Sequence, residues 1–440
     1  MWSYHADLLI RPVPRYTSYP TAAEFGGTVG PEDMGAALDA IGADAPISLY
    51  LHIPYCRTIC WYCGCNTGAA NRTARLDTYL ARLHDEIDLV AARLGGRGRV
   101  GRIAFGGGSP NAIPAAAFAA LVAHLRRVFA CAHAILSIEV DPRGFDAEWA
   151  AVLEDCGVSR VSLGVQTFDP ALQAAIGRVQ PLADIVHTVE LLRAAKVASI
   201  NFDLMYGLPG QDDAALAATL EGTLALAPER LAVFGYAHVP HMIPRQRRID
   251  ATALPDAEAR FGQAALAHRQ LTAAGYRAVG FDHFALPGDA LARAAANGTL
   301  RRNFQGFTED PADILIGLGT SAISQFPDRL LQNAKNAGEW HAGIGAGRFA
   351  TARGIRRSAL EQQRGRAIEA LLCRGAADLA DLPERDAVKA RLHAFKSVGL
   401  IAWQGTRLLL MDDALPYART IAAAIDAWRV VDDPRFSHAV

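Results

Sequence analysis

Residues 48–66 read SLYLHIPYCRTICWYCGCN and carry the most informative pattern in this chain of 440 residues. The alternating aliphatic and aromatic run Leu49–Ile53 predicts a strand, and Pro54 ends it. Four of the chain's seven cysteines follow within ten residues, at Cys56, Cys60, Cys63 and Cys65. Such crowding in a loop at the carboxyl end of a strand predicts a metal centre.

The spacing of these cysteines favours an iron–sulfur cluster over two alternatives. Structural zinc sites draw their ligands from two separated pairs, and the other three cysteines of this chain stand singly. A disulfide framework is unexpected in a long chain with an odd cysteine count and no signal-peptide pattern. Thiolates at Cys56, Cys60 and Cys63 fit three irons of a [4Fe–4S] cube and leave the fourth iron open for a small molecule. We interpret Cys65 as a loop thiol without an iron.

Composition narrows the class of protein and its partners. Hydrophobic residues make up 51% of the chain, and a formal net charge of −1 provides no basic field for nucleic acid. The first residues, MWSYHADLLIRPVPRY, lack the apolar segment of a signal peptide, and no run reaches transmembrane length. We therefore expect a cytoplasmic protein with no nucleic-acid or membrane partner. Nothing in the sequence demands a second chain, so a monomer is expected.

Beyond the cysteine loop, predicted strands and helices alternate. Counting the opening strand, six strand–helix units with short connections predict a parallel sheet of the α/β class. Six units fall short of the eight of a closed barrel, so we expect an open, partial β/α barrel. Tyr276–Phe284 and Ile314–Ile323 are expected to add strands at its edge. The five further parallel strands are predicted at Arg99–Phe105, Ile135–Val140, Val161–Val165, Ile200–Met205 and Leu231–Tyr236.

Neither end of the chain shows the alternation of predicted strands and helices that marks its middle. Residues 1–45 hold three prolines and weak periodicity, which predicts an extended N-terminal arm, and residues 46–325 form the barrel. Residues 326–352 are expected to be a linker. In residues 353–440, short helices surround one hairpin-like stretch, which predicts a smaller, mainly helical C-terminal domain, resembling a winged helix, that caps the barrel.

Unusual residues gather where the predicted strands end, which is where parallel α/β folds bind ligands. Gly106–Gly108 allows a ligand to approach the backbone closely. Glu139, Gln166, Asp203 and His238 each end an apolar run. Any one of them could be no more than a cap or a solvated strand end, but four of them beside the cysteine loop predict a shared pocket.

Specific segments in a fixed order give the chain a family resemblance. The pattern Cys-x3-Cys-x2-Cys, with Tyr62 before the third cysteine, resembles the signature of the radical S-adenosylmethionine (SAM) superfamily. From about residue 12 to 325 the chain resembles the oxygen-independent coproporphyrinogen III oxidases (dehydrogenases) of haem biosynthesis. The segments that carry this resemblance, besides the cysteine loop, are the Pro14–Pro20 arm, FGGGSP (105–110), SIEVDPR (137–143), RVSLGVQTF (160–168), FDLMYGLPGQ (202–211), FGYAHVP (234–240), FDHFALP (281–287) and RNFQGFT (302–308).

The resemblance implies the cofactors of an oxidoreductase and the residues that hold them. It implies one [4Fe–4S] cluster with three cysteine ligands, Cys56, Cys60 and Cys63, and two SAM molecules. It implies that the SAM on the open iron touches Tyr50, Tyr62, Gly107, Glu139 and Ile323. It implies that the second SAM touches Gly108, Ser109, Gln166, Arg178, Asp203 and Ala237. No catalytic residue is assigned beyond these cofactor ligands.

The reaction that the resemblance implies is a radical decarboxylation. SAM is cleaved reductively to a 5′-deoxyadenosyl radical, which abstracts a β-hydrogen from a propionate side chain of the tetrapyrrole substrate. Loss of CO2 and one electron leaves a vinyl group, and two such events convert coproporphyrinogen III to protoporphyrinogen IX. The electron donor is not identified by the sequence.

The chain departs from the family pattern at a few positions. Ser109 stands where Thr is usual, Gly235 stands where Asn is common, and Gly177 precedes Arg178 where a polar residue is usual. The predicted helix around residues 363–373 keeps the basic and apolar character that is usual in the family, but its amino-acid sequence differs from the family pattern. Two alternatives therefore stay open, another radical SAM enzyme acting on a porphyrin and a haem-binding chaperone of the same family. The presence of Cys65 and of the arm disfavours the chaperone.

Overall fold

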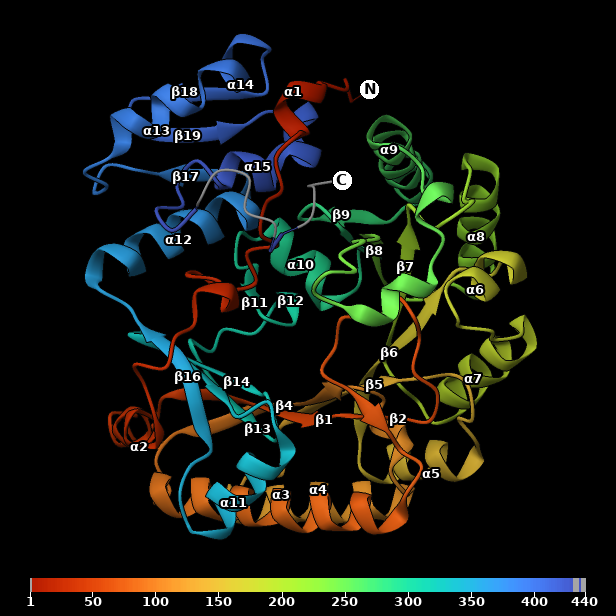
Figure 1. Cartoon of the computed structure of the whole chain (residues 1–440), viewed down its shortest axis with the longest axis vertical. Helices are drawn as coiled ribbons and strands as arrows, with labels where there is room; N and C mark the ends of the chain where they lie inside the picture. Colours follow the sequence, from red (N-terminus) through yellow and green to blue (C-terminus); the bar gives the residue numbers. More distant parts are fainter. Residues whose placement is uncertain (1, 430–434, 437–440) are drawn as a thin grey trace.

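A single curved sheet of twelve strands organises the protein, whose computed structural model describes residues 2–429 and 435–436 (Figure 1). The predicted parallel strands all form, and β13 (Ile314–Leu318) joins them by pairing in parallel with β1. The terminal strands of the sheet do not pair with each other, so the barrel is open as predicted. In spatial order the six predicted strands are β1 (Pro46–Ile53), β4 (Arg99–Gly107), β5 (Ile135–Val140), β6 (Val158–Gln166), β7 (Ser199–Tyr206) and β8 (Arg230–Gly235).

Helices cover the outer face of the sheet and begin at well-defined caps. Aspartates at 146, 212 and 256 accept hydrogen bonds from backbone N–H groups in the first turns of α5, α8 and α9, respectively. Gly95, in the left-handed conformation, ends the first long helix. The covering helices are α3 (Thr73–Leu94), α4 (Ala115–Val128), α5 (Ala147–Asp155), α6 (Pro170–Ala175), α7 (Leu182–Ala194), α8 (Asp213–Leu226) and α9 (Ala257–Ala273).

Antiparallel strands extend both edges of the parallel sheet. Beyond β8 lie β10 (His283–Ala285) and β9 (Arg277–Val279), and beyond β13 lie β14 (Ile323–Phe326), β15 (Arg329–Asn333) and β16 (Thr351–Arg356). A separate two-stranded ribbon consists of β11 (Arg301–Asn303) and β12 (Gly306–Thr308), with α10 (Ala290–Ala296) before it. The stretch 326–352, expected to be a linker, is therefore not a connection between bodies. It holds β15 and α11 (Ala337–Gly345) and completes the sheet.

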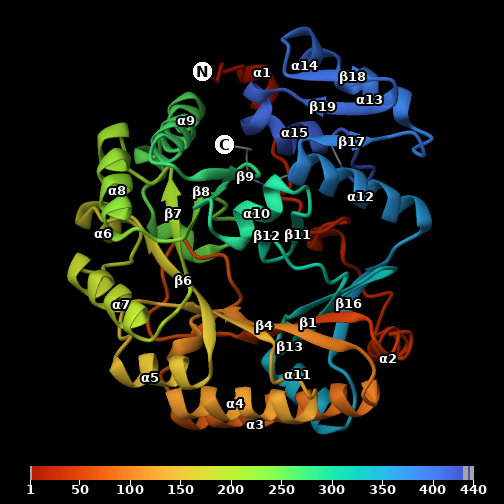
Figure 2. The same ribbon diagram turned by 180° about the vertical axis from the view of Figure 1, so that it is seen from behind.

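The C-terminal part packs around a second hydrophobic cluster. The predicted hairpin is present as β18 (Ile401–Gln404) and β19 (Arg407–Leu410), and β17 (Ala376–Asp378) pairs with β19. Both views place this part at the opposite end of the molecule from α3 and α4 (Figures 1 and 2). Residues 430–434 and 437–440 of the predicted domain lie outside the described residues. Its helices are α12 (Ala359–Arg374), α13 (Arg385–Arg391), α14 (His393–Ser397) and α15 (Ala418–Ala422).

The N-terminal residues are held between the barrel and the C-terminal part. Besides two helices, α1 (Ala6–Leu9) and α2 (Pro31–Asp39), these residues include the segment 12–20, which has no helix or strand and is largely buried. The Tyr16 hydroxyl donates to Asp426 Oδ2 at 3.0 Å, and the backbone N–H of Ala427 donates to the Tyr19 hydroxyl at 3.1 Å. Arg302 donates to the carbonyls of both residue 15 and Tyr16. The arm therefore joins two parts of the molecule that are far apart in sequence.

A buried charge cluster fills the base of the barrel. Glu309, which follows β12, pairs with Arg102 (Nη1 to Oε1, 2.7 Å), with Arg160, and with Arg230 (Nη1 to Oε2, 3.6 Å). Its side chain is only 9% exposed. Burial acts to raise the pKa of Glu309, but the three guanidinium groups outweigh it and lower that pKa to about 2. These ion pairs connect the end of the β11–β12 ribbon to the N-terminal halves of β4, β6 and β8.

Candidate functional site

The four clustered cysteines line one cavity at the carboxyl ends of the parallel strands. Their loop starts at β2 (Tyr55–Cys56), which pairs in parallel with β3 (Gly68–Ala69). The backbone N–H of Trp61 in the same loop donates to the carbonyl of Ile176 at 3.1 Å. The cavity has a volume of about 190 Å³ and is bounded by the loop and by the ends of β4, β5, β6 and β7.

The cysteine sulfurs lie among hydrogen-bond donors. Arg178 Nη1 donates to Cys60 Sγ at 3.2 Å, and Arg143 Nη2 donates to the same sulfur at 3.4 Å. Hydrogen bonds from Cys65 lower the pKa of Cys63 to about 6, whereas burial raises the pKa of Cys56 to about 11. Two guanidinium groups therefore donate to one sulfur of the cysteine loop.

This donor set suits a cluster better than a single metal ion. Among the described residues, no three His, Cys, Asp or Glu side chains are arranged to hold one ion, as a mononuclear zinc site requires. The cysteines instead stand around a shared cavity, and a [4Fe–4S] cube takes its thiolates at separate iron corners. The residues therefore fit a cluster.

The structure brings eleven of the fourteen residues expected at the site to this one cavity. Tyr50, Ala237 and Ile323 do not line it. Tyr50 is buried on β1 against Phe304, and its hydroxyl lies 3.3 Å from His52 Nδ1. The expected residues that line the cavity are Cys56, Cys60, Tyr62, Cys63, Gly107, Gly108, Ser109, Glu139, Gln166, Arg178 and Asp203.

Of the two other expected residues, Ala237 is linked to the cysteine loop by hydrogen bonds, and Ile323 lies on a strand at the edge of the sheet. The carbonyl of Ala237, just beyond β8, accepts a hydrogen bond from Gln246 Nε2 at 3.0 Å, and the same amide donates to the carbonyl of Tyr62 at 2.9 Å. Ala237 is thus linked to the loop through one side chain. Ile323 begins β14, on the far side of β13 from the parallel strands. The roles assigned to these residues stay predictions.

Half-buried carboxylates of β5 and β7, Glu139 and Asp203, line the cavity. Burial raises the pKa of Glu139 to about 7, although its Oε2 accepts a hydrogen bond from the Gly107 N–H at 3.1 Å. Burial also raises the pKa of Asp203, whose oxygens accept hydrogen bonds from Ser162 and Asn201, both at 2.9 Å. Two half-buried acceptors that face one cavity suit a ligand with ammonium and hydroxyl donors.

Gln166 has an unusual backbone for a residue at a strand end. Its φ is +66°, in the left-handed region that residues other than glycine seldom adopt. The register of β6 against β7 shifts at the same place, between Gly164 and Gln166. Backbone held in this region costs free energy and is concentrated at functional sites. The strain therefore coincides with the lining of the cavity.

A second cavity continues from the first into the barrel. Glu139, Ser162 and Asp203 line both, and the second extends down to the Arg102, Arg160 and Arg230 cluster at the barrel base. Sequence reasoning did not single out Asp141, Arg143, Ser162 or Asn201, all of which hold site residues in place. A signal was available for Asn201, because it lies two residues before Asp203 in the same strand and so shares its face.

Gly108 is fixed by close backbone contacts at the end of β4. Its N–H donates to the carbonyl of Ile53 at 2.9 Å, and the N–H of Ser109 donates to the carbonyl of Tyr55 at 2.8 Å. A Cβ at Gly108 would lie 2.5 Å from the Tyr55 carbonyl oxygen. Only glycine at position 108 lets the segment Gly106–Gly108 (the glycine segment) pack this closely against the backbone of residues 53–55, which leads into the cysteine loop.

We predict that Gly108→Ala lowers SAM affinity by at least about tenfold, because the new methyl group must push the glycine segment away from the cysteine loop. Equilibrium dialysis of SAM against the reconstituted protein measures the effect. Gly101→Ala is the matched control, because a Cβ at Gly101 meets no atom within 4 Å. Equal SAM affinity for Gly108→Ala and the unmodified protein would contradict the close-packing argument.

Known proteins resemble this chain over most of its length. The radical SAM superfamily matches residues 50–221. An oxygen-independent coproporphyrinogen III oxidase of Bradyrhizobium diazoefficiens is 42% identical over 424 residues, which cover 94% of each chain. One of Pseudomonas aeruginosa is 41% identical over 84% of this chain and 82% of its own.

A solved structure has the same fold. Coproporphyrinogen III oxidase from Escherichia coli, described as a radical SAM enzyme, superposes with a TM-score of 0.90 at 33% identity, over 97% of this chain and all of its own. The similarity thus includes the arm and the C-terminal part as well as the barrel. None of the helices in the described residues has both the length and the apolar character needed to span a bilayer. The chain belongs to the oxygen-independent coproporphyrinogen III oxidase family of the radical SAM superfamily.

Proposed function

We propose that this protein is an oxidoreductase that converts coproporphyrinogen III to protoporphyrinogen IX without oxygen. It would decarboxylate two propionate side chains to vinyl groups. The observation that carries the proposal is one cavity in which the clustered cysteines meet Gly107, Gly108 and the carboxylates of Glu139 and Asp203. The extent of the family similarity supports it, because one relative that bears this name aligns over 94% of the chain.

Membership of the radical SAM superfamily implies a [4Fe–4S] cluster and SAM as cofactors. We propose further that Cys56, Cys60 and Cys63 are the three cluster ligands, that one SAM completes the open iron and that a second SAM binds nearby. When bound and reduced, the cluster and SAM supply a 5′-deoxyadenosyl radical, which is the reactive species of the decarboxylation. The cofactors carry the difficult chemistry, and the protein orients them and excludes water.

The residues around the cavity have tasks that follow from their contacts. Arg178 donates to Cys60 Sγ and also to Asp141 Oδ1 (3.3 Å) and the Gly164 carbonyl (2.6 Å), so it fixes the cysteine loop to the ends of β5 and β6. Glu139 and Asp203 present acceptors to ribose hydroxyl and ammonium groups. Enclosure of the cofactors in this cavity would limit the access of water, which protects a radical from side reactions.

We propose that the protein works as a cytoplasmic monomer with a tetrapyrrole substrate. Its electrons would come from a separate one-electron donor, because its described residues hold one cluster-type cysteine group and no second one. A net charge of −1 supports the expectation that nucleic acid is not a partner.

An anaerobic turnover experiment tests the function directly. Reconstituted protein, SAM, a reductant and coproporphyrinogen III are incubated, and tetrapyrroles and 5′-deoxyadenosine are quantified together. We expect protoporphyrinogen IX with about two deoxyadenosines per product, one for each decarboxylation. Deoxyadenosine without a porphyrin product would indicate another substrate. Neither product, from protein with an intact cluster and retained haem, would favour the chaperone alternative.

A further inference from the structure

Two segments beside the cysteine cavity carry arginines and no carboxylates. Residues 55–76 and residues 236–249 each contain three arginines, and neither segment contains an aspartate or a glutamate. The chain as a whole is nearly neutral, with 44 Lys and Arg residues against 45 Asp and Glu residues, so this excess of positive charge is local. The six arginines, which we call the arginine rim, are Arg57, Arg72, Arg75, Arg245, Arg247 and Arg248.

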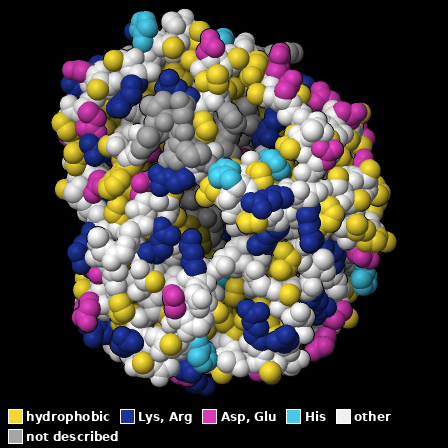
Figure 3. Space-filling model, viewed as in Figure 1, with side chains coloured by type: hydrophobic (Ala, Val, Ile, Leu, Met, Phe, Trp, Pro, Cys, Tyr) yellow, Lys and Arg dark blue, Asp and Glu magenta, His cyan; other side chains and the backbone are white. Residues whose placement is uncertain are grey.

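Contacts of a short helix, η3 (Pro244–Arg248), hold part of the rim against the cysteine loop. Arg245 Nη2 donates to the carbonyl of Cys65 at 3.4 Å. The guanidinium carbon of Arg248 lies 5.8 Å from the centre of the Trp61 ring. Figure 3 shows Lys and Arg side chains gathered to the right of the middle of one face, where Figure 1 has the green chain that follows β8.

The other arginines of the rim come from the cysteine loop itself and from the start of α3. Arg57 follows the first cysteine, and its Nη1 donates to the carbonyl of Gly144 at 3.3 Å. The guanidinium carbon of Arg75 lies 5.6 Å from the centre of the Tyr55 ring. Both segments thus place arginines on the cysteine loop or next to it, and Cys65 of that loop is itself exposed.

The chain does not neutralise the arginine rim by ion pairs. Five of the six side chains are exposed, and Arg245 is half-buried. Within residues 2–429 and 435–436, no carboxylate oxygen lies within 4.0 Å of a nitrogen of these guanidinium groups. Other surface arginines do have such a partner, as Arg97 has in Asp39 (Nη2 to Oδ1, 3.5 Å). The rim is therefore a source of positive potential that attracts an acidic partner.

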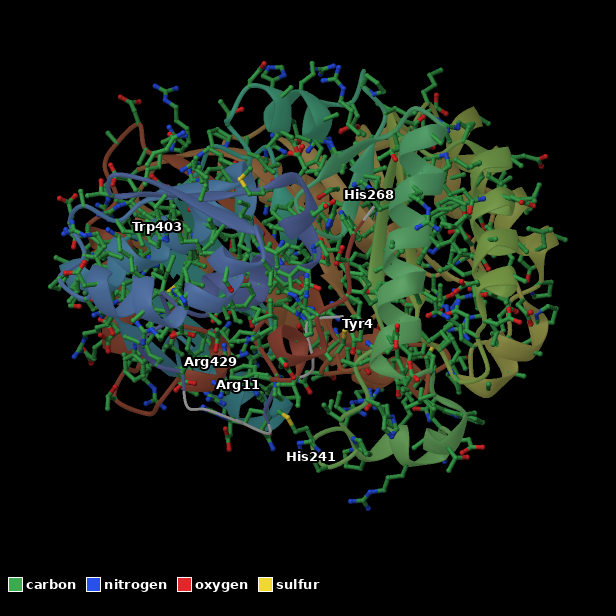
Figure 4. All side chains as sticks on the ribbon, turned by 90° about the horizontal axis from the view of Figure 1, so that it is seen from above. Tyr4, Arg11, His241, His268, Trp403 and Arg429 are labelled. Carbon is green, nitrogen blue, oxygen red and sulfur yellow. The ribbon has the colours of Figure 1, made fainter. Side chains whose placement is uncertain are left out.

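Exposed apolar side chains accompany this positive charge. Met242, two residues before η3, is 52% exposed. Val179 and Leu182 are 63% and 51% exposed, and they follow Ile176, whose carbonyl accepts a hydrogen bond from the cysteine loop. Figure 4 shows His241, the neighbour of Met242, at the outer edge of the molecule. Exposed apolar groups bordered by arginines, without carboxylates, are typical of a surface that binds another protein.

We propose that the arginine rim docks a small acidic protein that carries a low-potential one-electron centre and reduces the cluster. The proposal rests on the proposed function, because SAM cleavage needs a reduced cluster and the described residues hold no second cluster-type cysteine group. In each transfer the docked protein loses one electron and the cluster gains one, and no atom is exchanged. Electron transfer slows steeply with distance, so the exposed cysteine loop is the place where such a protein must dock.

The same surface suits a protein better than a nucleic acid. Arginines attract phosphate groups as well as carboxylates, and most contacts to a nucleic acid are made to its phosphates and sugars. The apolar side chains of Met242, Val179 and Leu182 would find little to cover them there. A folded partner with acidic groups around an apolar centre matches both features of the surface.

The test uses the full-length, reconstituted protein and a plant-type [2Fe–2S] ferredoxin, an acidic carrier of low reduction potential, as the probe. Its affinity is measured anaerobically by surface plasmon resonance. The double variant Arg247→Glu, Arg248→Glu should weaken ferredoxin binding by about tenfold or more, because it turns attraction into repulsion. Binding to the unmodified protein should weaken as salt is added, since the charges are exposed and screened.

A small reductant separates docking from the chemistry. SAM cleavage driven by reduced ferredoxin should fall in the double variant, whereas cleavage driven by dithionite, which needs no docking surface, should match that of the unmodified protein. Arg57→Glu, on the other segment, should have the same two effects and keeps the test valid if the double variant does not fold.

The matched control is the double variant Arg269→Glu, Arg277→Glu, which changes the net charge equally at exposed positions of α9 and β9. It should bind ferredoxin within about twofold of the unmodified protein, because distant exposed charges are screened. Ferredoxin that does not bind, or that binds the rim variants as tightly as the control, would overturn the proposal. So would rim-dependent binding of a DNA duplex in preference to ferredoxin, which would assign the surface to a nucleic acid.

The two proposals fail in distinguishable ways. If the unmodified protein forms protoporphyrinogen IX with dithionite and the rim variants keep its ferredoxin affinity, the docking surface is wrong but the function stands. If ferredoxin binds through the rim and drives SAM cleavage, but no protoporphyrinogen IX forms with either reductant, the proposed reaction is wrong but the docking surface stands.

Discussion

Cys60→Ala abolishes both the brown visible absorption of the cluster and SAM cleavage; this is the largest functional effect that we expect. Cys60 stands between the other two proposed ligands, and its sulfur receives hydrogen bonds from both Arg178 and Arg143. Without this thiolate the cube loses one of three anchors, and the two guanidinium groups lose the acceptor that they share. The measurements are the absorption spectrum after anaerobic reconstitution and the yield of 5′-deoxyadenosine.

Two other cysteines provide the controls for this experiment. Cys131 is buried near the end of α4, where its thiol donates to the carbonyl of Leu125, and it does not line the cavity. Cys131→Ala should keep the cluster and the cleavage activity. Cys65→Ala should also keep the cluster, because Cys65 is not among the proposed ligands. Full SAM cleavage by Cys60→Ala would overturn the ligand assignment, and loss of the cluster in Cys65→Ala would add a fourth ligand to it.

Glu309→Gln has the largest expected effect on stability. It removes the carboxylate that Arg102, Arg160 and Arg230 share at the barrel base and leaves three cations around a neutral amide. Breaking a buried ion pair by neutralising one partner costs about 3 kcal/mol or more. The midpoint of thermal or denaturant unfolding at neutral pH should fall accordingly. Glu154→Gln is the control, because its partner Lys196 is 82% exposed and the pair contributes little.

The stability difference between Glu309→Gln and the unmodified protein should depend on pH. The arginines lower the folded-state pKa of Glu309 to about 2 from an ordinary value of 4.5. Above pH 4.5 the stabilisation is fully present, and it is lost as the pH falls toward 2. The two proteins should therefore differ most at neutral pH and converge in acid. If the difference in stability between the two proteins stays constant down to pH 3, the charge of the Glu309 carboxylate does not stabilise the base of the barrel.

Local sequence patterns predicted the barrel well because strand and helix periodicity is a local property. The five further strands all appear, and the rule that ligands bind at carboxyl ends brought Glu139 and Asp203 to the cysteines. The pattern did not predict that residues 326–352 extend the sheet, because β15 is short and, although it forms a hairpin with β14, its other partner β16 lies beyond α11.

Side-chain directions and distant pairings were equally beyond sequence reasoning. The assignment of Arg178 to the second SAM stays a prediction, and the sequence did not show that its guanidinium group also donates to Cys60, Asp141 and Gly164. The Glu309 cluster joins charges from four segments that are far apart in the sequence. Such contacts are set by tertiary packing, and no spacing along the chain encodes them.

The docked arm has a consequence for how the chain reaches its final structure during synthesis. Tyr16 leaves the ribosome early, but its partner Asp426 lies 410 residues later. Since translation adds on the order of 5–20 residues per second, the arm waits for about half a minute with its aromatic side chains uncovered. The contact between the arm and the C-terminal part thus forms late in synthesis and joins residues that are very far apart in the sequence. A nascent chain that stops short of residue 426 therefore has a complete cysteine loop and a barrel that the arm cannot yet close.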